Sequence, residues 1–222
     1  MKNLVRDYRI FMGRTGIITH AALIGVIDGI ILAVALTRLF APLPQHIAEF
    51  IDGFMSSVAF AVPAGCIGAN FGIINCNSPM TPGYKLFHFL PDCGRRFRNA
   101  LLFTNIMSVV FMLAAVGIVC AYFALIDSLM SGFRILVLLS FGFAALGITN
   151  FFGFVRSVMA RLVTMMAVGG MVGFMFGFMD DVEVGAEIPA VMWIIAAAAA
   201  AVWAASIVYV ALSAQKWWCR EK

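Results

Sequence analysis

The stretch NALLFTNIMSVVFMLAAVGIVCAYFA, from residue 99 to residue 124, decides the fold class of this chain. It contains no charged residue and is longer than the roughly 20 residues that a helix needs to cross the hydrocarbon layer of a bilayer. It is also too continuous for the alternating pattern of a membrane β-barrel strand. The stretch therefore predicts a transmembrane α-helix.

Similar apolar stretches occur along the rest of the chain. With 63% hydrophobic residues, 12% charged residues and a mean hydropathy of +1.00, the chain has more apolar surface than a soluble core could bury. We therefore expect an all-α integral membrane protein, with residues 1–222 forming a single transmembrane domain of six helices. The expected spans are 17–40, 54–75, 99–124, 135–155, 162–179 and 189–213.

The basic residues predict the orientation of these spans. When six spans are threaded through a membrane, every Lys and Arg except Arg38 and Arg134 falls on the side that holds both chain ends. The positive-inside rule makes that side cytoplasmic, so we expect a multi-pass protein of the cell (cytoplasmic) membrane with both ends inside. A basic cytoplasmic face suits anionic membrane lipid, and we expect no nucleic-acid partner.

The two ends of the chain carry further membrane signals. Residues 1–14 place apolar side chains on one helical face and basic ones elsewhere, which predicts a short N-terminal helix lying in the cytoplasmic interface. The alternative is an ordinary basic anchor before the first span. The length of that span argues against a cleaved signal peptide. Near the other end, Trp217 and Trp218 are expected to form an aromatic belt at the interface.

The residues that usually carry catalysis form no recognisable group. The chain has five cysteines without CxxC spacing, and its three histidines fall in different segments. Neither a zinc site nor a nucleophile with a partnered base is indicated. We therefore expect no metal, no cofactor and no catalytic residue, and we do not expect an enzyme.

Small residues recur at every fourth position in the first expected span, including Gly25 and Gly29. Such spacing lets helix backbones approach closely in lipid. We favour packing inside one chain over a subunit interface for this face.

Asp28 is the one acid inside an expected span, and it falls near the membrane centre. A carboxyl group there costs roughly 2.5–3.5 kcal/mol on the insertion scale, so it should face the bundle interior or a transport pathway. Asn70 and Asn105, in the second and third spans, are possible hydrogen-bond partners. The alternative is a protonated acid with a structural role.

The segment 77–98 is the longest expected cytoplasmic loop. Turn residues bracket a short aromatic stretch, and Asp92 is placed to cap the helix that becomes the third span. Exposed aromatics need a membrane surface or a partner protein to cover them. The residues expected to make that contact are Tyr84, Lys85, Phe87, His88, Phe89 and Leu90.

This layout resembles the ABC-2 class of ATP-binding-cassette permease subunits. The resemblance rests on six spans with cytoplasmic ends, an amphipathic N-terminal helix, and a loop in which a short helix is followed by Leu90-Pro91 and a basic stretch. It implies that residues 84–90 form a coupling helix that docks into a separate cytoplasmic ATPase subunit. It also implies a homo- or heterodimer of permease subunits. The chain departs from the family pattern in having Asp92, Cys93 and Gly94 directly after Leu-Pro.

Three functions are compatible with these features. The first is the transmembrane permease subunit of an ATP-driven transporter, which needs a separate ATPase because this chain has no phosphate-binding GxxxxGK[ST] motif. The second is a secondary transporter or channel that uses Asp28 for proton or cation coupling. The third is a non-transporting membrane scaffold or regulatory subunit.

Overall fold

The regular structure of the chain is helical wherever it is described. The computed structural model describes residues 2–58, 73, 89–126, 132–152, 159, 163, 166 and 188–220. Within these residues the all-α class expected from the sequence is confirmed. The helices are α1 (Lys2–Phe40), α2 (Gln45–Val58), α5 (Cys93–Leu125), α6 (Gly132–Phe152) and α8 (Ala190–Arg220).

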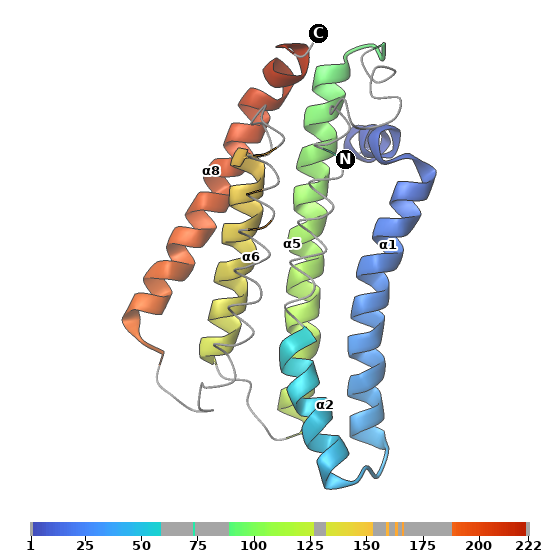
Figure 1. Ribbon diagram of the computed structural model, residues 1–222, viewed down its shortest axis with the longest axis vertical. Helices are drawn as coiled ribbons and strands as arrows, with labels where there is room; N and C mark the ends of the chain where they lie inside the picture. Colours follow the sequence, from blue (N-terminus) through green and yellow to red (C-terminus); the bar gives the residue numbers. More distant parts are fainter. Residues whose placement is uncertain are drawn as a thin grey trace.

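The long helices stand side by side in an elongated bundle (Figure 1). α5 packs along α1 and along α8, and α8 packs along α6. Both chain ends lie at one end of the bundle, which we call the terminal end. The connection between α1 and α2 lies at the opposite end, which we call the far end. α1 and α5 run from the terminal end to the far end, whereas α6 and α8 run back.

Three of the described helices are long and apolar enough to cross a membrane. They are Cys93–Leu125, Gly132–Phe152 and Ala190–Trp218, judged by length and composition. These correspond to the third, fourth and sixth of the expected spans. The first expected span lies within α1, which is not one of the three. Most of the second and fifth lies outside the described residues.

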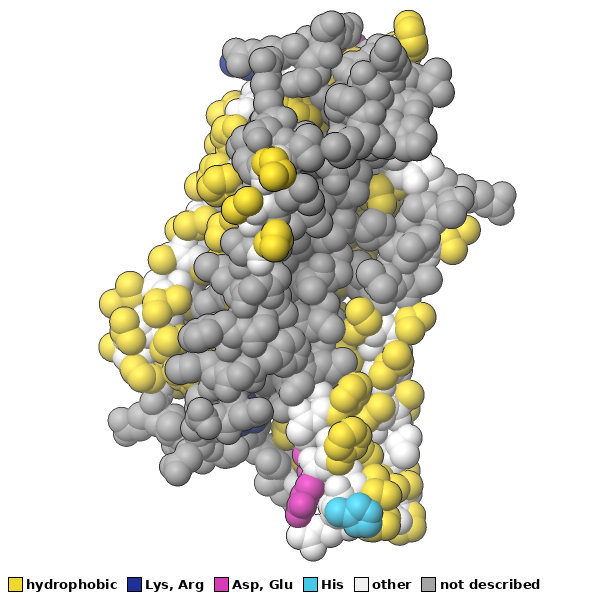
Figure 2. All heavy atoms as spheres, viewed as in Figure 1, with side chains coloured by type: hydrophobic (Ala, Val, Ile, Leu, Met, Phe, Trp, Pro, Cys, Tyr) yellow, Lys and Arg dark blue, Asp and Glu magenta, His cyan; other side chains and the backbone are white. Residues whose placement is uncertain are grey.

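Outward-facing side chains fit a lipid environment. Large apolar residues are exposed along α1, α5 and α8, including Leu36, Val110 and Ile194. Figure 2 shows hydrophobic side chains along the outer sides of the described helices, with acidic and histidine side chains gathered near the far end. Apolar surface of this extent is unusual on a water-soluble monomer. The described helices are therefore those of a membrane protein.

The helix boundaries differ from those expected, most clearly at the second span. Residues 45–53 were expected to lie in an external loop, but they are the first part of α2, and the loop shrinks to residues 41–44. Pro44 starts the helix, because its carbonyl oxygen accepts hydrogen bonds from the amides of Ile47 and Ala48, each at 3.0 Å. Hydropathy alone misses this amphipathic turn because it carries His46 and Glu49. The third span likewise begins early, at Cys93.

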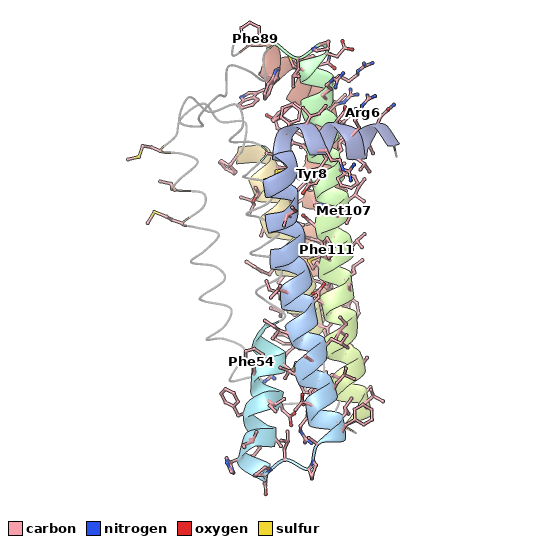
Figure 3. The ribbon with its side chains drawn as sticks, turned by 90° about the vertical axis from the view of Figure 1, so that its right-hand side faces the viewer. Arg6, Tyr8, Phe54, Phe89, Met107 and Phe111 are labelled. Atoms are coloured by element: carbon pink, nitrogen blue, oxygen red, sulfur yellow. The ribbon has the colours of Figure 1, made fainter. Side chains whose placement is uncertain are left out.

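The segment before Gly13 is a helix that lies across the bundle at the terminal end (Figure 3). The chain bends at Gly13, whose φ of 61° and ψ of 176° are not helical. Essentially only glycine adopts this combination, so Gly13 makes the bend possible. The expected short N-terminal helix is therefore present as a distinct segment, here called the N-terminal segment (residues 2–12).

Two clusters of buried side chains form the core. One lies among α1, α2, α5 and α6 and includes Ile31, Met55, Val119 and Leu138. The other lies at the terminal end and joins the N-terminal segment to the start of α5 and the end of α8. The second cluster therefore ties both chain ends to the helix that follows the expected coupling loop.

Candidate functional site

The expected coupling loop is described only from Phe89 onward. Tyr84, Lys85, Phe87 and His88 lie outside the described residues, as does Asn70. Phe89 is 83% exposed and stands at the extreme terminal end (Figure 3). An exposed aromatic ring is available for contact with a membrane surface or a partner protein.

Leu90, directly after Phe89, is anchored to the protein. It packs against the buried cluster at the terminal end, whose members include Phe97 and Trp218. Phe89 is thus exposed while its neighbour Leu90 packs on the core around α5, and the Leu90 contact fixes the end of the loop to that core.

Asp92 precedes α5 as expected, but its side chain does not cap the helix. Its backbone is left-handed, with φ 56° and ψ 31°, and its carboxylate makes no hydrogen bond to the first-turn amides. Instead Arg95 Nη2 donates to Asp92 Oδ2 at 2.6 Å. The helix still begins here, since the Arg96 amide donates to the Asp92 carbonyl oxygen at 3.0 Å. The expected side-chain cap is therefore replaced by an ion pair at the surface.

Four aromatic side chains, Phe11, Phe97, Trp217 and Trp218, form what we call the aromatic junction. The Phe97 ring lies 4.7 Å from the Trp218 ring and 5.6 Å from the Phe11 ring, measured between centroids. Trp217 stacks on Phe97 at 5.7 Å. Trp218 is fully buried, so its ring lies inside the junction and not on the outer surface. Its ring serves packing between α5, α8 and the N-terminal segment instead.

A buried carboxylate strengthens the same junction. Asp7 is 2% exposed, and Asn99 Nδ2 donates to its Oδ2 at 2.8 Å. Arg6 and Arg96 lie on either side, with nitrogens 3.6 Å and 4.0 Å from Oδ1. Burying a carboxyl group is costly unless hydrogen bonds and opposite charges compensate for the lost water. The sequence analysis missed Asp7, although its position as the one acid among the basic residues of the N-terminal segment was a signal.

Asp28 lies half-buried on α1. Its Oδ1 is buried without a hydrogen-bond partner among the residues that the structure describes. No described residue lies within 4 Å of the positions that a Cβ would take at Gly25 and Gly29, and both glycines are exposed. At these two positions the small-residue face is therefore exposed and packs against no described residue.

Asn105 belongs to a buried polar network that joins α5, α6 and α8. Its Nδ2 donates to Asn150 Oδ1 at 3.2 Å, and Asn150 Nδ2 donates back to Asn105 Oδ1 at 2.8 Å. Asn150 also donates to Ser206 Oγ at 2.9 Å, and all three side chains are fully buried. The sequence analysis named Asn105 but missed Asn150 and Ser206. Asn150 could have been recognised as a polar amide side chain near the end of the apolar fourth span.

These polar groups join helices to one another. The asparagine network satisfies its own hydrogen bonds, and buried Asp7 accepts a hydrogen bond from Asn99 and lies near two arginines. Among the described residues, no group of three or more His, Cys, Asp or Glu side chains is arranged to hold a metal ion. The terminal end thus offers an exposed contact at Phe89, joined to a rigid junction.

No protein-family model, curated protein or solved structure matches this chain.

Proposed function

We propose that this chain is the transmembrane permease subunit of an ATP-driven transporter, acting with a separate cytoplasmic ATPase subunit in the cell membrane. The observation that carries this proposal is the pairing of exposed Phe89 with packed Leu90 at the start of α5. An exposed aromatic anchor fits a groove on a partner, and aromatic anchors commonly dominate such interfaces. A second permease subunit would complete the pathway.

α5 is suited to carry a movement of the loop through the membrane. Its 33 residues span about 50 Å at 1.5 Å per residue. At the terminal end it is fixed to the N-terminal segment and α8 by the aromatic junction and Asp7. Further along, the Asn105–Asn150 pair joins it to α6. A push on the loop would therefore shift α5 together with its neighbours rather than bend it alone.

The directions of the described helices support six crossings. α1 ends at the far end and α5 begins at the terminal end, so the chain between them makes one return. α6 ends at the terminal end and α8 begins at the far end, so a second return separates them. These directions support the proposal of six crossings, of which three lie in described helices that are long and apolar enough to span a membrane.

Charge supports a cytoplasmic terminal end. Arg6 lies there (Figure 3), and the first turns of α5 carry Arg95, Arg96 and Arg98. The far end has Arg38 in the last turn of α1 and Arg134 in the first turn of α6. By the positive-inside rule the terminal end faces the cytoplasm, where an ATPase can reach Phe89.

Co-purification tests the proposal. The chain is co-expressed with the ATP-binding-cassette ATPase encoded closest to its gene and extracted in mild detergent. We expect the wild type to retain the ATPase. The Phe87→Ala, Phe89→Ala double variant should bind the ATPase with an affinity lowered by more than tenfold, since each anchor can contribute roughly 2 kcal/mol at an interface hot spot. Phe50→Ala is the matched control, because Phe50 is 73% exposed but belongs to α2 at the far end.

Three results would contradict the proposal: no ATPase retained by the wild type, full retention by the double variant, or equal loss from the Phe50→Ala control. In the last case the aromatics serve general membrane anchoring.

A secondary transporter or channel is the alternative that a specific observation favours. Asp28 Oδ1 is buried on α1 without a hydrogen-bond partner among the described residues. A carboxyl group in that state can take up and release a proton during transport. Proton flux without ATP distinguishes this alternative, as described in the Discussion.

A further inference from the structure

Three side chains from three helices meet at the far end of the bundle. Arg38 lies in the last turn of α1, Asp52 lies on α2, and Tyr122 lies in the last turns of α5. Arg38 Nε is 3.4 Å from Asp52 Oδ1, and the Tyr122 hydroxyl donates a short hydrogen bond to the same oxygen. Asp52 is thus held from two sides by groups on two different helices.

The partners differ in how firmly they are fixed. The Tyr122 side chain is 1% exposed, and its ring packs edge-on against Phe123 at 5.1 Å. Arg38 and Asp52 keep 28% and 29% of their side chains exposed. The Tyr122 side chain is therefore held in place on α5. Water reaches the Arg38–Asp52 ion pair and can take the place of either partner when the helices separate.

Apolar contacts hold α2 only along a narrow strip. Among its described side chains, Ala48 and Met55 are buried, while most of the others are exposed or half-buried. Two of its large apolar side chains, Phe50 and Phe54, are exposed, whereas Ile51 and Met55 pack in the core cluster. The contacts of Asp52 therefore add polar links from α2 to both α1 and α5 beside this apolar packing.

We infer that Arg38, Asp52 and Tyr122 form a releasable latch that holds α2 against α1 and α5 and keeps the far end of the bundle closed. Release of Asp52 frees α2 to move away while α5, α6 and α8 stay packed. The latch lies at the opposite end from Phe89 and works in the same way with or without an ATPase partner.

Hydrogen–deuterium exchange of the purified full chain in lipid nanodiscs tests the latch. We expect Asp52→Ala and Tyr122→Phe each to speed exchange in α2 by roughly tenfold or more, because each removes a hydrogen bond to a charged group. The double variant should exchange no faster than Asp52→Ala, since both changes break the same contact. Exchange in α6 and α8 should not change.

Glu49→Gln is the matched control. Glu49 lies on the same helix, is exposed, and accepts a hydrogen bond from Gln45 of α2 itself at 2.8 Å. The Glu49→Gln change removes the same negative charge as Asp52→Ala but breaks no contact with α1 or α5, so α2 should exchange at the wild-type rate. Acceleration equal to that of Asp52→Ala would overturn the latch, because charge on α2 alone would then explain the effect.

Tyr122→Phe keeps the buried ring, so of these variants it should disturb folding least. Unchanged α2 exchange in this variant would overturn the latch, and so would faster exchange in every helix, which marks a general loss of stability. The wild type supplies a second test. A releasable latch requires α2 to exchange faster than α5 and α6, and equal protection of all three would show a permanent joint instead.

Discussion

Asn150 of α6 and Asn105 of α5 exchange hydrogen bonds, with Asn150 Nδ2 donating to Asn105 Oδ1 at 2.8 Å and Asn105 Nδ2 donating back to Asn150 Oδ1 at 3.2 Å. The pair is fully buried, and Asn150 extends the network to Ser206 of α8. Because each amide satisfies the other, the network fixes the register of three helices without leaving a polar group unpaired in an apolar core.

Replacing Asn150 should therefore destabilise the bundle. Asn150→Leu removes partners from Asn105 and Ser206 while leaving both buried, at a cost of about 1–3 kcal/mol. We expect a lower melting temperature of the purified protein in detergent, measured by thermal unfolding. Thr149→Val is the control, since the Thr149 hydroxyl donates to the Ala145 carbonyl oxygen of its own helix at 2.7 Å. Equal melting temperatures for the two variants would contradict the joining role of Asn150.

The bend at Gly13 gives a second prediction. Gly13→Ala places a side chain on a backbone that essentially only glycine adopts, which costs about 1–3 kcal/mol. The strain should loosen the N-terminal segment, and limited trypsin digestion should cut faster after Arg9. Gly25→Ala should leave the cutting rate unchanged, because Gly25 is helical with nothing within 4 Å of the new Cβ. Resistance of Gly13→Ala to trypsin at the wild-type level would count against the bend as the fixed point.

Sequence reasoning identified the features that depend on long apolar runs. The helices α5, α6 and α8 follow from hydropathy, and the amphipathic pattern before Gly13 predicts a separate N-terminal helix. The start of α2 was missed because its first turns are polar enough to read as a loop. Hydropathy places a helix in the membrane but does not say which neighbour each face meets.

The polar contacts between helices were harder to predict for the same reason. Asn105 was recognised as polar in an apolar run, but its partner Asn150 lies 45 positions away in the chain. The Tyr122–Asp52 contact joins residues 70 positions apart. Choosing such partners requires the packing order of the helices, and an apolar pattern does not encode that order. Gly25 and Gly29 show the opposite case. Their spacing is typical of close helix packing, yet no described residue packs against them.

Asp28 provides the prediction that separates the two transport mechanisms. Proteoliposomes containing the purified chain without an ATPase are loaded with a pH-sensitive dye and given a pH gradient. An ATP-driven permease should show the same background proton flux for the wild type and for Asp28→Asn, which keeps the shape and hydrogen-bonding capacity of the side chain. ATP-independent flux that is present in the wild type and lost in Asp28→Asn would favour the secondary transporter or channel.

The sidedness of the terminal end is the central claim, because a cytoplasmic ATPase can reach Phe89 only if that end faces the cytoplasm. Truncations fused to a reporter that is active only in the cytoplasm measure it directly. We predict activity after Gly83 and after Ala160, and no activity after Ala41, Asp127 and Glu183. The site after Ala41 lies in the short connection before α2. An inactive reporter after Gly83, together with an active one after Ala41, would reverse the orientation and contradict the proposed function.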